Sequence, residues 1–505
     1  MHEIITLQLG QRSNYVATHF WNLQESYFTY SENEESPVNH DIHFRPGVGA
    51  DGTETFTPRT IIYDLKGGFG SLKKYNELYQ MEEESGMPRG LWDGNEIIQQ
   101  QPQIQQSEYQ KSLDLGLTPP PLTSETVRYW SDFNRVFYHP RSIVQLNDYE
   151  LNSRLMPFED WEVGEELFKD LDKEHDLLDR DVRPFAEECD QLRALQIFSG
   201  ADDAWGGFSA RYIDRLRDEY GKTSIWVWAL EDGAKVQRQK QILRSMNVAK
   251  SIAAISPQVS LYTPIMDPPH PLPTYLNIDL QSEWYRSALI TSAIESATLP
   301  SRLRQYHDIE AALAGEDGTH KIFELKASVV PEDKERPAGS SRADTGATAA
   351  TAEGDGNDED TKFDINFSYI DPAGKYHTFN EIQIARGFQF DKGDEPWLEN
   401  STLARRKRLF NSQSTLQRFD TSLRLPILDS FPRNLFTDSR PEVGIKVHAA
   451  LTATSAMADR IKALQAIAAR AVGVDEREAL VNDLGEIRET YEQGWMSDLD
   501  SGEDD

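Results

Sequence analysis

Three glycine-containing loops are the segments of this chain whose residue types and spacing could do chemistry. Each loop follows a predicted strand and precedes a predicted helix. Glycine lets the backbone approach an anion closely, and the free N–H groups of a helix N-terminus suit a phosphate. The candidate residues are Gly10, Gln11 and Asn14 in the first loop, Gly67 and Gly68 in the second, and Gly206, Gly207 and Ser209 in the third. Nucleotide binding is therefore one hypothesis, and ordinary tight turns are the other, since neither a G-x-G-x-x-G nor a Walker A pattern is present.

The other reactive side chains form weaker patterns. Residues 40–43 contain two histidines and an aspartate without further ligand spacing, so the sequence indicates no metal site. Cys189 lies among acidic residues, which raise the pKa of a thiol and argue against a nucleophile. No catalytic residue is assigned. The basic cluster at 405–408 is interpreted as a solvated helix face, with an acidic partner, an anionic membrane or a nuclear signal as alternatives.

Alternating strands and helices must position the three loops. Apolar runs predict buried strands over 4–9, 60–65, 194–198 and 223–230, and helical apolar spacing follows the first and third of them. A short helical stretch is also expected after residue 70. This alternation favours a doubly wound, mainly parallel sheet with helices on both faces. The loops after its strands lie together at the carboxyl edge, where ligands bind in such sheets.

Composition excludes several classes of protein. The chain has 505 residues, with 84 acidic against 52 basic side chains and a formal net charge of -32. Nucleic-acid phosphates repel so acidic a molecule, so we expect no direct binding to DNA or RNA. A single cysteine excludes an internal disulfide and fits a reducing compartment. We expect no transmembrane helix, and the N-terminus is typical of neither a secretory signal nor a transit peptide.

Composition also predicts how the chain is divided. The expected units are an α/β domain over 1–310 with a glutamine-rich insertion near 95–120, a second α+β domain from 311–330 and 363–454, an acidic disordered insertion over 331–362, C-terminal helices over 455–492 and an acidic tail over 493–505. The acidic insertion is expected to be disordered because it has almost no large apolar side chain to bury. The C-terminal helices are predicted from apolar residues at helical spacing.

Several stretches make the chain similar to a known family. Residues 1–14 resemble the tubulin N-terminus, in which a strand ends in a Gly-Gln phosphate loop followed by Asn. Residues 61–72, 130–143 and 198–220 resemble the Misato family of tubulin-related proteins, and the likeness covers about 1–310. The resemblance implies a tubulin-like fold. It also implies GTP or GDP as the candidate ligand.

The resemblance implies Gly10, Gln11, Asn14 and Asp64 as the main nucleotide contacts, but three departures from tubulin argue against hydrolysis. The third loop keeps only two glycines and adds two bulky aromatics, which block the close approach of a phosphate. Lys66 stands where tubulin has an acidic residue associated with magnesium, and a lysine cannot ligate that cation. No match is found to the tubulin loop whose acidic residue completes the site of the next subunit.

Fungal members of the Misato family act in mitochondrial DNA inheritance. The resemblance therefore implies a role in mitochondrial partitioning. Together with the three departures from tubulin, it leads us to expect a non-catalytic, cytoskeleton-related scaffold. The lack of a transit peptide favours the cytosolic face of the mitochondrion, along with the cytoplasm. The expected partners are cytoskeletal or mitochondrial-surface proteins. Two alternatives stay open: a filament-forming GTPase of the tubulin type, and an adaptor for tubulin or its folding machinery. If the chain is non-catalytic, Gln11→Ala leaves any hydrolysis rate unchanged.

Overall fold

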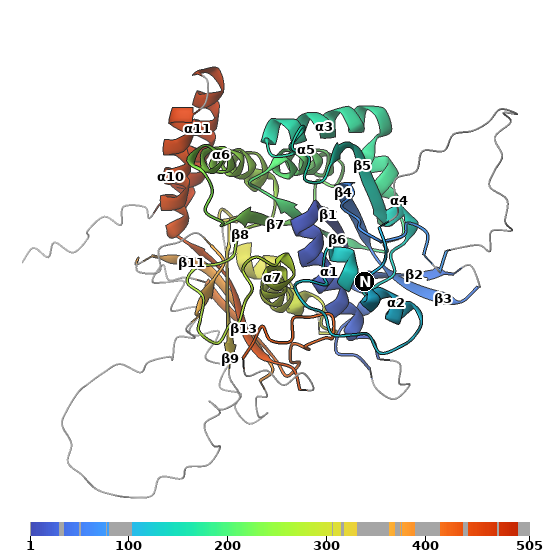
Figure 1. Cartoon of the computed structure of the whole chain (residues 1–505). Helices are drawn as coiled ribbons and strands as arrows, with labels where there is room; N and C mark the ends of the chain where they lie inside the picture. The colour runs from blue at the N-terminus through green and yellow to red at the C-terminus, as the bar shows by residue number, and fades with distance from the viewer. Residues whose placement is uncertain are drawn as a thin grey trace, which may run out of the picture.

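The computed structural model places two main sheets and their helices side by side (Figure 1). The structure describes residues 2–29, 35–49, 52–76, 78–79, 104–305, 307–314, 318–330, 363–368, 374, 376–388, 415–437, 443–471 and 474–492. The predicted acidic insertion, the acidic tail, the basic cluster at 405–408 and residues 95–103 of the glutamine-rich insertion lie outside them.

The first sheet has six parallel strands in the order β5-β4-β1-β6-β7-β8. Its strands are β1 (Glu3–Leu9), β4 (Thr60–Lys66), β5 (Ile143–Glu150), β6 (Leu192–Gly200), β7 (Ser224–Asp232) and β8 (Leu261–Asp267). The strand order is that of a doubly wound sheet, with the switch point between β1 and β6. The predicted fold class is confirmed.

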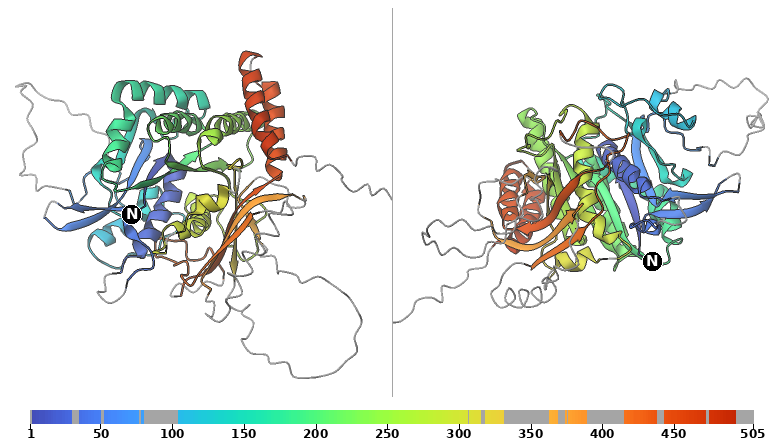
Figure 2. Two further views of the ribbon diagram at one scale, coloured as in Figure 1. Left: turned by 180° about the vertical axis from the view of Figure 1, so that it is seen from behind. Right: turned by 90° about the horizontal axis from the view of Figure 1, so that it is seen from below.

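Helices cover both faces of this sheet, as Figures 1 and 2 show. The long helices are α3 (Trp161–His175), α5 (Ala204–Glu219) and α6 (Arg238–Ile255) on one face, and α1 (Gln11–Ser26) and α7 (Glu283–Thr298) on the other. The shorter ones are α2 (Glu108–Asp114), α4 (Arg183–Ala186), α8 (Ile309–Ala314), a π-helical turn over Leu178–Val182, and 3₁₀ turns over His40–Ile42, Trp130–Phe133, Pro140–Ser142, Ser256–Gln258 and Leu299–Ser301.

The second sheet has five strands in the order β10-β9-β13-β11-β12. They are β9 (Glu324–Val330), β10 (Ile365–Asn366), β11 (Thr378–Arg386), β12 (Thr415–Thr421) and β13 (Lys446–Thr454), and only the β11–β12 pair is parallel. Helix α7 lies between the two sheets and contacts β9, β11 and β13. The C-terminal helices α10 (Ala456–Ala471) and α11 (Val474–Thr490) pack on each other and on α6. A hairpin of β2 (Phe44–Val48) and β3 (Glu54–Pro58) extends from the body.

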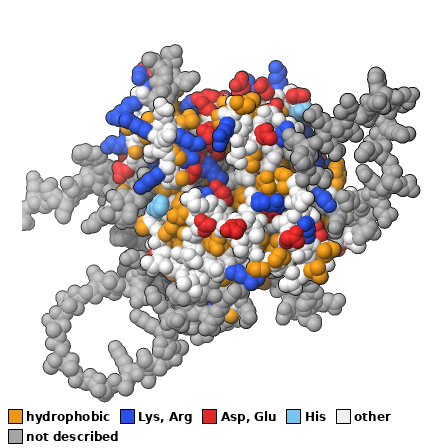
Figure 3. All heavy atoms as spheres, in the orientation of Figure 1, with side chains coloured by type: hydrophobic (Ala, Val, Ile, Leu, Met, Phe, Trp, Pro, Cys, Tyr) orange, Lys and Arg blue, Asp and Glu red, His pale blue; other side chains and the backbone are white. Residues whose placement is uncertain are grey.

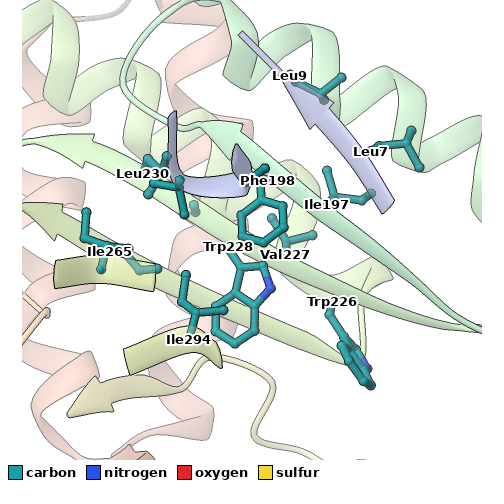
Figure 4. Packing of buried hydrophobic residues seen from close by; sticks show 14 of the residues in the cluster. Leu7, Leu9, Ile197, Phe198, Trp226, Val227, Trp228, Leu230, Ile265 and Ile294 are labelled. Carbon is teal, nitrogen blue, oxygen red and sulfur yellow. The ribbon is translucent and has the colours of Figure 1, made fainter. Parts of the chain in front are cut away.

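The core explains why the strands of the first sheet are almost continuously apolar. Both faces of a parallel sheet are covered by helices, so side chains pointing either way are buried. Val227 and Trp228 are adjacent residues of β7 that point to opposite faces, and neither is exposed (Figure 4). Helix α7 is buried nearly all round for a related reason, because it has a sheet on each side.

Two local expectations are wrong. The first is the short helix expected after residue 70: the described part of that segment contains turns instead. The second wrong expectation is that Gly206, Gly207 and Ser209 lie in a loop before a helix. Helix α5 already begins at Ala204, so all three residues are helical. The reason is a cap: the side chain of Asp203 accepts a hydrogen bond from the Trp205 N–H at 3.0 Å and starts the helix there.

Candidate functional site

A cavity of about 180 Å³ lies at the carboxyl ends of β1 and β6, at the switch point of the first sheet. Doubly wound sheets bind their ligands at this place. The residues that line it are Leu9, Gly10, Gln11, Arg12, Ser13, Leu65, Glu150, Leu151, Asn152, Ser153, Pro157, Phe158, Glu159, Gly200, Asp203 and Trp205. The cavity is therefore the candidate functional site.

The first loop contributes one corner of this cavity. Gly10 has a φ of 88° and is followed at once by α1, whose N-terminus has no side-chain cap. Three buried atoms beside it have no hydrogen-bond partner, namely Gln11 Oε1, Arg12 Nη1 and the Oγ of Ser13. Of these atoms, Arg12 Nη1 and the Ser13 hydroxyl can donate, whereas Gln11 Oε1 can only accept. An uncapped helix N-terminus with two such donors can receive an anion. This corner keeps some of the chemistry that the sequence predicts.

An ion-paired group of the chain itself lies directly beside this corner. Asp203 caps α5, and its Oδ2 accepts a hydrogen bond from Arg12 Nη2 at 2.8 Å. Arg12 also pairs with Asp202. Burial alone would lower the pKa of Arg12, but the two carboxylates hold it well above the ordinary value. A carboxylate thus occupies the helix N-terminus at which a phosphate would bind.

Trp205 covers the first loop. A Cβ added at Gly10 would clash with the indole ring, so the ring lies directly on the Gly10 backbone. Phe158 packs against Trp205 edge to face, with 5.2 Å between the ring centroids. Together the two rings block the backbone surface that a phosphate would approach.

The predicted residues of the third loop serve helix packing. A Cβ at Gly207 would clash with the carbonyl oxygen of Trp161 in α3, and a Cβ at Gly206 with the Oγ of Ser251 in α6. Ser209 is buried and donates its hydroxyl to the Gly206 carbonyl at 3.0 Å. None of these predicted residues lines the cavity.

The predicted residues of the second loop form an internal turn. Asp64 is fully buried, and its carboxylate accepts hydrogen bonds from Asn14 Nδ2 at 2.8 Å, the Leu65 N–H at 2.8 Å and Trp130 Nε1 at 3.2 Å. Burial raises the pKa of Asp64 to about 6 and outweighs these three bonds. Gly67 has a φ of 88°, and a Cβ at Gly68 would clash with the Asp64 carboxylate.

Only Gly10 and Gln11 of the predicted site residues line the cavity, while Asn14 and Asp64 bond each other outside it. Sequence reasoning missed Arg12 and Asp203. A signal for Asp203 existed, because an aspartate directly before a helical apolar pattern is a common N-cap. No pattern in the sequence could reveal its ion pair with Arg12, which joins residues 191 positions apart.

The charges of the cavity disfavour an anionic ligand. Glu150, Glu159 and Asp203 line it. Among the described residues, Arg12 is the single cationic lining residue, and it already pairs with two carboxylates. In the described part of the chain, no group of three His, Cys, Asp or Glu side chains could hold a metal ion. Burial raises the pKa of Cys189 to about 11, so its thiol is protonated at neutral pH.

The face of the molecule drawn in Figure 3 carries both signs of charge. Acidic and basic side chains lie side by side on this face (Figure 3), in spite of the net charge of -32. Among the described helices, none combines the length and the apolar character needed to span a bilayer.

The sheet order and the cavity at its switch point define a doubly wound α/β protein, and the family matches make it tubulin-like. Residues 119–303 match the Tubulin domain family, and residues 2–115 match the Misato Segment II tubulin-like domain. The chain is 62% identical to Protein dml1 of Aspergillus niger and 46% identical to Protein dml-1 of Neurospora crassa, each over 100% of both chains. It is 33% identical to Protein dml1 of Schizosaccharomyces pombe over 63% of this chain and 70% of the relative. The chain belongs to the Misato and DML1 family of tubulin-like proteins.

Proposed function

We propose that this chain is a non-catalytic scaffold that supports the partitioning of mitochondria and the inheritance of mitochondrial DNA. Family membership supports the mitochondrial part, because fungal members of the Misato family act in that process. The observation that carries the non-catalytic part is the group of Arg12, Asp203 and Trp205 in the candidate site.

Phosphoryl transfer depends on positive charge that stabilises the transferring phosphoryl group. In the candidate site Arg12 is instead held by Asp202 and Asp203, and further carboxylates line the cavity. The cavity of about 180 Å³ is also smaller than the roughly 300–1,000 Å³ of ordinary small-molecule sites. Both features argue against a bound nucleoside triphosphate.

A scaffold acts through its surfaces. We infer peripheral association with the cytosolic face of mitochondria, and partners among cytoskeletal or mitochondrial-surface proteins. The absence of a membrane-spanning helix from the described residues is consistent with a peripheral position. Net charge works against direct contact with mitochondrial DNA, so a role in its inheritance would pass through protein partners.

The first test concerns the nucleotide. The protein is purified natively and denatured, and the released small molecules are identified by chromatography, with tubulin treated in parallel as a positive control. We expect no stoichiometric guanine nucleotide. Stoichiometric GDP or GTP would contradict the proposal and favour the filament-forming GTPase. Turnover provides a second check: Gln11→Ala should leave any residual hydrolysis unchanged, and a large loss in that variant would show a working site.

The second test concerns the cellular role. In cells that lack the gene for this chain, we expect a fall in the ratio of mitochondrial to nuclear DNA, measured by quantitative PCR. Reintroduced wild-type protein and the Gln11→Ala variant should both restore the ratio. An unchanged ratio in the deletion strain would contradict the mitochondrial role. Co-purification of the chain with tubulin or a chaperonin, in that case, would support the adaptor.

A further inference from the structure

The segment between α2 and the turn at Trp130–Phe133 contains an exposed proline-rich stretch. We call residues 115–122 the proline strap; their sequence is Leu-Gly-Leu-Thr-Pro-Pro-Pro-Leu. The strap lies at the seam between the two family matches, of which one ends at 115 and the other begins at 119. From residue 117 onward it has no helical or strand structure.

Covalent geometry dictates the shape of the strap. Each of Pro119, Pro120 and Pro121 has φ held near −65° and lacks an N–H. A residue that precedes a proline is pushed out of the helical region toward extended conformations, and this applies to Thr118, Pro119 and Pro120. These two constraints together favour a polyproline II helix, whose backbone makes no internal hydrogen bonds.

Burial along the strap follows the three-residue repeat of such a helix. Half-buried positions are Pro119 and Leu122, and exposed ones are Leu117, Thr118, Pro120 and Pro121. One edge of the helix therefore rests on the protein, with Leu122 packed against the core. The two other edges, each with a proline, face outward.

The strap is held at both ends. The Leu117 N–H donates to the Ser112 carbonyl at 2.8 Å, which ties the start of the strap to the end of α2. After the strap, the Thr126 N–H donates to the Thr123 carbonyl at 3.1 Å and closes a turn. A segment fixed in its extended form loses little conformational entropy on binding.

We propose that the proline strap is a docking site for a partner domain with an aromatic-lined polyproline groove. Such grooves accept the ridges of a preformed polyproline helix. Exposed apolar side chains extend the presented surface, since Leu115 is 72% and Leu117 60% exposed. No strap residue is charged, in a chain whose net charge is -32, so the contact is apolar and requires no acidic specificity pocket. This inference is independent of the nucleotide state of the candidate site.

The test uses the full chain and an array of isolated SH3, WW and EVH1 domains, with binding measured by isothermal titration calorimetry. We expect at least one domain to bind, and the variant Pro120→Ala/Pro121→Ala to lose at least about tenfold in affinity for it. Pro46→Ala changes an exposed proline of β2 instead and should bind like the wild type. Raising NaCl from about 0.05 to 0.5 M should change the affinity less than about twofold, because no ion pair forms.

Three results would overturn the proposal. The first is that no domain binds the chain although each binds its own proline-rich peptide. The second is equal binding by the wild type and the double variant. The third is an affinity that falls steeply with salt. Circular dichroism and the thermal midpoint, which should match between the double variant and the wild type, separate a lost contact from a lost fold.

Discussion

At the scale of single residues, acidic groups in and beside the candidate site serve the chain itself. Asp64, beside the cavity, accepts hydrogen bonds from three donors, which belong to Asn14, Leu65 and Trp130. Asp203 caps a helix and pairs with Arg12. Their common role is to satisfy backbone and side-chain donors at the carboxyl edge of the sheet. Such donors are costly to bury without partners.

We predict that Asp64→Asn destabilises the fold by about 1–3 kcal/mol at neutral pH, because an amide NH₂ must then face a donor. The exposed Asp218→Asn should change stability by less than about 0.5 kcal/mol. Both values follow from urea unfolding. An unchanged free energy of unfolding in the Asp64 variant would show that the three hydrogen bonds contribute little to stability.

Asp64 also makes the stability of the wild-type protein depend on pH, and Asp64→Asn removes this dependence. Burial raises the pKa of folded Asp64 to about 6, above its value in the unfolded chain. The stability tied to this raised pKa is fully present below about pH 4 and is lost as pH rises through 6. Between pH 4.5 and 7.5 the wild type should lose about 2 kcal/mol more than Asp64→Asn. Parallel pH profiles of the two proteins would contradict the assigned pKa.

At the scale of elements, glycines decide how closely the helices on one face approach each other. Gly207 of α5 lies against the Trp161 carbonyl of α3, and Gly164 of α3 lies against the Ala204 carbonyl of α5. Backbone contact between helices needs residues without a Cβ. These glycines therefore fix the packing of α3 on α5, although sequence reasoning assigned Gly207 to a phosphate loop.

We predict opposite signs for two Gly→Ala substitutions in helices. Gly207→Ala should destabilise by about 1–3 kcal/mol, because the overpacking outweighs the gain in helix propensity. Gly485→Ala in α11 should stabilise by about 0.5–1 kcal/mol, since its nearest neighbour is a side-chain atom, the Gln465 Nε2 at 3.3 Å, which has to shift by only a few tenths of an ångström. Denaturant midpoints measure both. A stabilised Gly207 variant would mean that α3 and α5 can separate freely.

At the scale of the whole molecule, a buried ionic cluster joins the two sheets. Arg386 of β11 pairs with Glu295 of α7 and donates to the Leu423 and Arg424 carbonyls at 3.0 Å. Arg302 donates to Glu295 at 3.0 Å. Burial alone would raise the pKa of Glu295, but the two arginines lower it below its ordinary value. The second sheet is thereby tied to the helix that also packs on the first.

We predict that Arg386→Ala destabilises the protein by about 3–5 kcal/mol, because it leaves a cavity and unpaired buried acceptors. The control is Arg304→Ala. The Arg304 side chain is 55% exposed, lies 3.7 Å from Glu35 and donates to the Ser36 carbonyl at 2.7 Å, so its loss should cost about 1 kcal/mol. Thermal unfolding followed by circular dichroism and by tryptophan fluorescence measures both. Equal midpoints for the two variants would contradict the joining role of the cluster.

The sequence alone predicted the doubly wound sheet, four of its six strands and the C-terminal helices. Each of these follows from apolar residues at a regular local spacing, which consecutive residues carry. Helix starts were less predictable. The first residue of α5 depends on the Asp203 cap, and the absence of a helix after Gly70 depends on a turn that packs against Tyr129 and Ser131.

Local pattern also marked where a ligand site belongs, at the loops after the strands of the first sheet. Only the tertiary structure decided what fills that place. Arg12 and Asp203 stand 191 positions apart and Asn14 and Asp64 stand 50 apart, so no local spacing relates them. The contact between the Trp205 ring and the Gly10 backbone is equally non-local. Periodicity along a chain reports which faces are buried, whereas ion pairs and close packing form only after folding brings distant residues together.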